Sequence, residues 1–149
     1  MWIWEFLHVL IGTLWIGLLY FFNLVQVQSM PKMTEEGAAK SYTQIILPRA
    51  LFLFRHAALW TVITGLVYYV MGRGTVEGIP SPEIMIGMLL GIIMAGNVWF
   101  IIWPNQKKII AGELEGDALA KAKRHAFLAS RTNAWLSLPM LIGMVAANH

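Results

Sequence analysis

Residues 131–149 read RTNAWLSLPMLIGMVAANH, a stretch whose middle is almost entirely apolar. A helix that crosses the hydrocarbon core of a bilayer needs roughly 20 mostly apolar residues, because each residue adds about 1.5 Å. Four stretches of this kind occur, at about residues 2–25, 51–71, 84–103 and 127–147. The chain has 149 residues, of which 58% are hydrophobic and only 13% charged. We therefore predict an all-α integral membrane protein, a single domain over residues 1–149 built as a four-transmembrane-helix bundle.

Basic residues gather in the first and third connections between the predicted spans. They are Lys32, Lys40, Arg49, Lys107, Lys108, Lys121, Lys123 and Arg124. The second connection has only Arg73. Because cytoplasmic connections carry an excess of Lys and Arg, this asymmetry predicts that both termini lie outside the cytoplasm. The net charge of +3 therefore indicates contact with membrane lipid, and we expect no nucleic-acid partner.

Two histidines, His8 and His149, lie near the same end of the predicted bundle, on its first and last spans. Ionisable side chains inside a membrane usually mark a functional site. Imidazoles from two helices can fill both axial positions of a haem iron, so the pair predicts a metal centre, most simply haem b. The spacing of three and four residues puts Glu5, Gly12 and Trp15 on the same face as His8.

Gly12 and Glu5 each allow more than one interpretation. Gly12 leaves room for a flat macrocycle, but small residues are also common where membrane helices pack together. Glu5 is a candidate hydrogen-bond acceptor behind a histidine ligand. Glu5, His8 and His149 could instead bind copper or zinc, although they supply few ligands. The chain has no cysteine, which excludes thiolate metal sites and a covalently attached haem within it.

Further polar groups fall inside the spans. Arg55, His56 and Arg131 are candidate cofactor-binding residues, because charges within a membrane tend to face the bundle interior. Alternatively, the arginines extend toward lipid phosphates and His56 bonds a neighbouring helix. For Asn97 we expect an interhelical hydrogen bond, and we expect His125 to be solvated.

Three motifs resemble a known family. They are residues 8–17 (HVLIGTLWIG), residues 97–106 (NVWFIIWPNQ) and residues 136–139 (LSLP), the last followed by Asn148 and His149. Together they resemble the membrane domain of the bacterial cytochrome-c-linked urate oxidases, or urate hydroxylases. The first motif alone is also similar to membrane protoporphyrinogen oxidases and copper-resistance proteins.

The resemblance implies a location in the bacterial inner membrane and a redox role, with a c-type cytochrome or a larger respiratory-type complex as partner. Larger members continue into a cytochrome c domain, and we expect this chain to be a short form without one. The chain departs from the family pattern at two positions. The family has an acidic residue at the position of His56 and a histidine at the position of Thr132.

Three functions therefore remain open. The first is a haem-b electron-transfer or oxidoreductase subunit, with urate oxidation as an activity that the resemblance implies. The second is a non-catalytic accessory subunit of a larger membrane complex, with its histidines only hydrogen-bonded. The third is a copper- or zinc-binding membrane protein. A homo-oligomer is compatible with each of them.

Overall fold

The computed structural model describes residues 2–73 and 81–146, and within them the chain is entirely helical. The described α-helices are α1 (Trp2–Tyr20), α2 (Val27–Glu35), α3 (Ala39–Ser41), α4 (Leu47–Tyr68), α5 (Pro82–Asn97), α6 (Trp103–Ala111) and α7 (Gly116–Ala146). Four π-helical segments adjoin them, at Phe21–Gln26, Tyr42–Ile46, Tyr69–Arg73 and Val98–Ile102. Three of these segments join successive α-helices without a break, so the predicted all-α class is confirmed.

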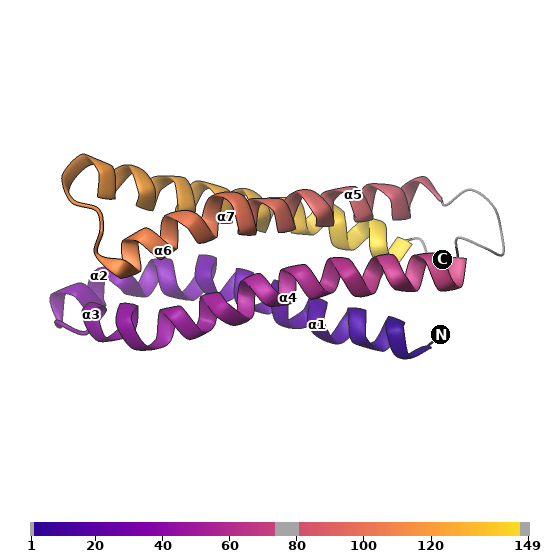
Figure 1. The fold of residues 1–149 in the computed structure, drawn as a ribbon, viewed down its shortest axis with the longest axis horizontal. Helices are drawn as coiled ribbons and strands as arrows, with labels where there is room; N and C mark the ends of the chain where they lie inside the picture. The colour runs from indigo at the N-terminus through magenta and orange to yellow at the C-terminus, as the bar shows by residue number, and fades with distance from the viewer. Residues whose placement is uncertain (1, 74–80, 147–149) are drawn as a thin grey trace.

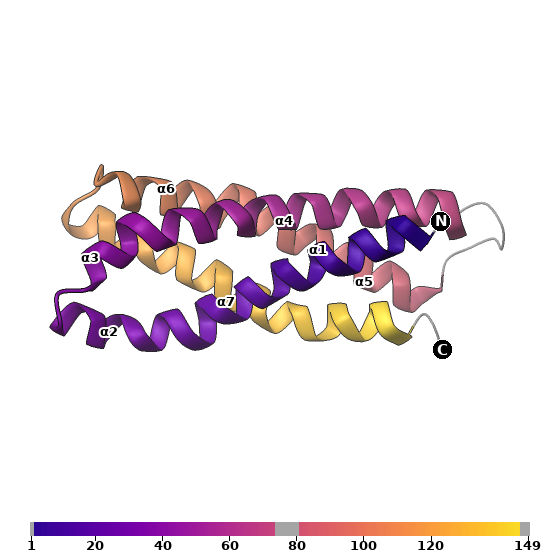
Figure 2. The same cartoon turned by 90° about the horizontal axis from the view of Figure 1, so that it is seen from below.

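The helices form four long antiparallel rods that run side by side (Figure 1). The α2–α3 and α6–α7 connections meet at one end, which we call the basic end because the lysine-rich segments lie there. Trp2, the end of α4, the start of α5 and the end of α7 lie at the opposite end, called the His8 end (Figure 2).

Three helices are long and apolar enough to cross a membrane: Trp2–Glu35, Ala39–Met71 and Pro82–Ala111. They are consistent with an integral membrane protein. The predicted fourth span is not confirmed within the described residues. Its helix, α7, forms as expected and continues through Pro139, but Arg131 and Asn133 interrupt the apolar part and the first half is charged.

The rods are longer than the predicted spans. A helix of 34 residues, such as Trp2–Glu35, extends about 51 Å, whereas the hydrocarbon core is about 30 Å thick. The extra length lies at the basic end, where the first rod continues through Pro31 to Glu35. Segments whose charged residues resemble those of loops are therefore parts of the long helices.

The rods pack as two close pairs, α1 with α4 and α5 with α7. In the second pair Gly143 and Gly87 lie where the two helices approach most closely. A Cβ atom added at Gly143 would lie 2.6 Å from the backbone oxygen of Glu83 and 3.1 Å from the backbone nitrogen of Gly87. Small residues recur every four positions on this face of α5, and all three, Gly87, Gly91 and Ala95, are buried.

Large apolar side chains fill the middle of the bundle, between the two pairs. Trp15 and Leu19 of α1 are fully buried, as are Met94 of α5 and the adjoining Val98. Phe22 packs its ring edge-to-face against Phe54 of α4, with 5.2 Å between the centroids. This core holds the two pairs together near their centre.

We predict that Gly143→Ala lowers the stability of the protein by about 1–3 kcal/mol, because the added methyl group overlaps the α5 backbone. The measurement is the thermal unfolding midpoint of purified protein in detergent. Gly91→Ala is the matched control, since Gly91 is buried on α5 but a Cβ there meets no atom within 4 Å. Alanine should be neutral or stabilising there, by about 0.5–1 kcal/mol. Equal destabilisation by both changes would contradict the close approach at Gly143.

Candidate functional site

His8 joins α1 to α4 through its imidazole ring. The Nδ1 atom lies 2.9 Å from the backbone carbonyl oxygen of Thr61, and the side chain is half-buried. A carbonyl oxygen can only accept, so Nδ1 carries the proton and donates. In a neutral imidazole the lone pair is then on Nε2, which is the form that binds a metal.

Gly65 provides the space that the His8 ring occupies. A Cβ atom at Gly65 would lie 2.7 Å from Cε1 and 2.9 Å from Nδ1 of His8. The ring therefore lies directly against the backbone of α4, one helical turn beyond Thr61. The hydroxyl of Thr61 donates to the carbonyl oxygen of Ala57 within its own helix. It therefore does not compete with His8 Nδ1 for the carbonyl oxygen of Thr61.

The three residues predicted to share a helix face with His8 lie in different surroundings. Gly12 packs against Thr61, whose Cγ2 atom would be 3.5 Å from an added Cβ, which is the helix-packing role. Trp15 is 1% exposed in the core, and its indole Nε1 has no hydrogen-bond partner among the described residues. Glu5 is exposed. His8 and Gly12 therefore meet at Thr61, while Glu5 and Trp15 lie apart from that contact.

The second predicted ligand, His149, lies outside the described residues. Side-chain hydrogen bonds join the first rod to α7 near the centre of the bundle. The hydroxyl groups of Tyr20 and Ser137 are 2.8 Å apart, and Asn23 Nδ2 donates to Ser130 Oγ at 2.9 Å. Among residues 2–73 and 81–146, no group of three or more His, Asp or Glu side chains could hold a metal ion.

His56 and Arg55 belong to an aromatic cluster nearer the basic end. Nδ1 of His56 lies 2.7 Å from the carbonyl oxygen of Phe52, and its ring packs against Phe52 and Trp99. The Arg55 guanidinium lies 3.8 Å from the ring centroid of Trp103. His56 precedes the Thr61–Gly65 contact by about seven residues of α4, or roughly 10 Å along the axis. It is not at the depth of His8.

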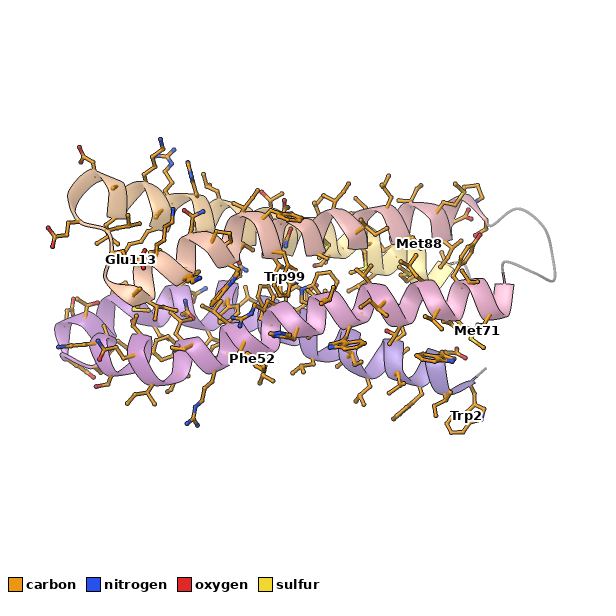
Figure 3. All side chains as sticks on the ribbon, in the orientation of Figure 1. Trp2, Phe52, Met71, Met88, Trp99 and Glu113 are labelled. Carbon is orange, nitrogen blue, oxygen red and sulfur yellow. The ribbon has the colours of Figure 1, made fainter. Side chains whose placement is uncertain are left out.

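Figure 3 shows where this cluster lies along the molecule. Trp99 is near the middle of the bundle, Glu113 marks the basic end and Trp2 the opposite one (Figure 3). Trp99 Nε1 donates to the carbonyl oxygen of Arg55 at 3.0 Å. The cluster therefore fastens α4 to the rod of α5 and α6.

The remaining candidates lie on the second pair of rods. The Arg131 guanidinium lies 5.2 Å from the ring centroid of Phe127, one turn earlier on the same helix, and His125 is exposed as expected. The expected interhelical bond of Asn97 is confirmed, because its Nδ2 donates to Asn133 Oδ1 at 2.8 Å. Asn133 is fully buried and also donates to the carbonyl oxygen of Met94 at 2.9 Å.

Two residues at this site were missed by sequence reasoning, Thr61 and Gly65. A signal was present, since a small residue recurs after four positions on the same face of α4. This spacing does not reveal which helix packs against that face of α4. It also does not reveal that a histidine ring occupies the space beside Gly65.

Over residues 2–73 and 81–146 the fold is all-helical, with three helices long and apolar enough to cross a membrane. The model of the urate oxidase N-terminal family matches residues 81–149, so this part of the chain is similar to that family. No curated protein and no solved structure matches the chain. The match covers α5, α6 and α7, which include the second and third motifs. His8 lies outside the matched part.

Proposed function

We propose that the protein is a haem-b-binding membrane subunit of an oxidoreductase, with His8 as an axial ligand. The observation that supports it is the bond between His8 Nδ1 and the Thr61 carbonyl oxygen. Histidines that bind metals commonly donate their other ring N–H to a carbonyl or carboxylate, which fixes the tautomer and the ring orientation. Here a backbone atom does this, and Gly65 allows it.

The described residues fit one axial ligand of a haem. His8 would hold the haem through Nε2, and we propose His149, the second histidine predicted from the sequence, as the other ligand. A bound haem would supply one-electron transfer. The chain's own contribution is to hold the His8 ring still and in the correct tautomer. The similarity of residues 81–149 to the urate oxidase N-terminal family supports a redox setting, with a c-type cytochrome or a larger membrane complex as the proposed partner.

We further propose that the basic end faces the cytoplasm of a bacterial cell and the His8 end faces outward. The excess of Lys and Arg at one end supports this orientation. Because the chain has no cysteine, single cysteines can be introduced as probes. Lys40→Cys should react with a membrane-impermeant reagent only after the cells are opened, and Gly78→Cys should react in intact cells. The reverse pattern would contradict the orientation.

The haem proposal predicts a reduced-minus-oxidised absorption spectrum of the purified protein with the sharp bands of a low-spin b-type haem. His8→Ala should lose these bands or convert the haem to a high-spin form, because one axial nitrogen is removed. Deletion of His149 should have a similar effect.

His56→Ala is the matched histidine control and should keep the wild-type bands. Loss of haem in His56→Ala but not in His8→Ala would contradict the assignment. A flat spectrum from well-folded wild-type protein would instead favour an accessory subunit, and bound copper or zinc measured in the same sample would favour the metal-site alternative.

A further inference from the structure

A pocket of about 550 Å³ opens at the basic end of the bundle. Its walls come from α2, from α3 and the segment Tyr42–Ile46, from α6 and from the first half of α7. The volume lies within the range of roughly 300–1,000 Å³ typical of small-molecule sites. Because the helices here continue beyond the predicted spans, the pocket is on the far side of the bundle from His8.

The lining combines apolar side chains with hydrogen-bonding groups and positive charge. The apolar part includes Leu51 and Ile102, which belong to the core. The polar lining residues are Asn23, Gln26, Gln44, Gln106, Thr34, Thr43, Ser130, Lys40 and Lys123. No acidic residue lines this pocket among the described residues, so its charged groups are all positive.

The two lysines come from different parts of the chain, Lys40 from α3 and Lys123 from α7. In the part of the chain that the structure describes, the ion pair joins Lys32 to Glu36 and leaves Lys40 and Lys123 without a carboxylate partner. Two ammonium groups that line one pocket without a carboxylate partner favour a negatively charged ligand.

The floor of the pocket contains a polar group with a missing partner. Asn23 is 3% exposed, and its Nδ2 donates to Ser130 Oγ and to the carbonyl oxygen of Leu19. Its Oδ1 has no hydrogen-bond partner within the described residues. Asn23 therefore contributes a buried amide beside the pocket, while the charged lining groups are the two lysines.

Gln26 adds a donor on the same side. Its Oε1 accepts a hydrogen bond of 2.6 Å from the hydroxyl of Tyr42, which fixes the carboxamide so that its NH₂ group is free to donate. An anion in this pocket therefore has ammonium and amide donors as well as apolar side chains available to it.

We propose that this pocket binds an organic anion with an apolar body, held by Lys40 and Lys123. Two sources have this chemistry, a small water-soluble molecule and the headgroup of an anionic lipid from the adjoining membrane leaflet. The proposal does not depend on haem at His8, since the two sites lie at opposite ends of the bundle.

The test uses the full chain in nanodiscs of phosphatidylcholine, which has no net charge. Benzoate and phenyl phosphate are the anionic probes, and benzamide is the neutral isostere of benzoate. Calorimetry should show saturable binding of at least one anion and at least tenfold weaker binding of benzamide. The double variant Lys40→Gln/Lys123→Gln should weaken anion binding at least tenfold. Both lysines are exposed, so their replacement leaves the core intact, which a thermal melt verifies.

Lys108→Gln is the matched control, because Lys108 is an exposed lysine of the same end that does not line the pocket. It should leave binding unchanged. Nanodiscs with phosphatidylglycerol separate the two sources: a lipid ligand abolishes probe binding there, and a soluble ligand leaves it intact. The proposal is overturned if neither anion binds in phosphatidylcholine, if benzamide binds as well as benzoate, or if Lys108→Gln has the effect of the double variant.

Discussion

Close approach of helix backbones at glycine is the constraint on which the arrangement depends. Lipid tails are as apolar as leucine, so helices in a membrane associate by packing and hydrogen bonding rather than by expelling water. Gly143 lets α7 touch α5, and Gly65 lets the His8 ring of α1 lie on α4. The two pairs that result are joined by the core around Trp15 and by hydrogen bonds from α7.

The polar groups divide according to their place along the rods. In the middle, Asn97 bonds to Asn133, Asn133 bonds to the Met94 carbonyl oxygen, and the Ser137 hydroxyl bonds to that of Tyr20, so these groups hold helices together. At the two ends, bonding capacity is left over: Nε2 of His8 on one side, and the ammonium groups of Lys40 and Lys123 in the pocket on the other. A redox centre and an anion site at opposite ends would give the bundle two separate functions.

Much of the fold was predictable because apolar length and charge are read directly from the sequence. The helices and the Asn97 bond were predicted correctly, since a lone amide inside an apolar helix needs a partner on another helix. The fourth span is not confirmed, because Arg131 and Asn133 lower the apolar character of α7. Thr61 and Gly65 could not be predicted, since the carbonyl that meets His8 depends on how α1 and α4 cross. The pocket was missed because the sequence segments that line it resemble charged loops.

The most direct test of the account is the absorption spectrum of Gly65→Ala, because this change removes no candidate ligand and alters only the support of His8. An added methyl group would lie 2.7 Å from the His8 ring, so the ring must move. The account predicts less haem, or high-spin haem, in a protein that is still helical. Gly17→Ala is the control, since a Cβ there meets nothing within 4 Å. A Gly65→Ala protein with the wild-type low-spin spectrum and full haem content would contradict the account.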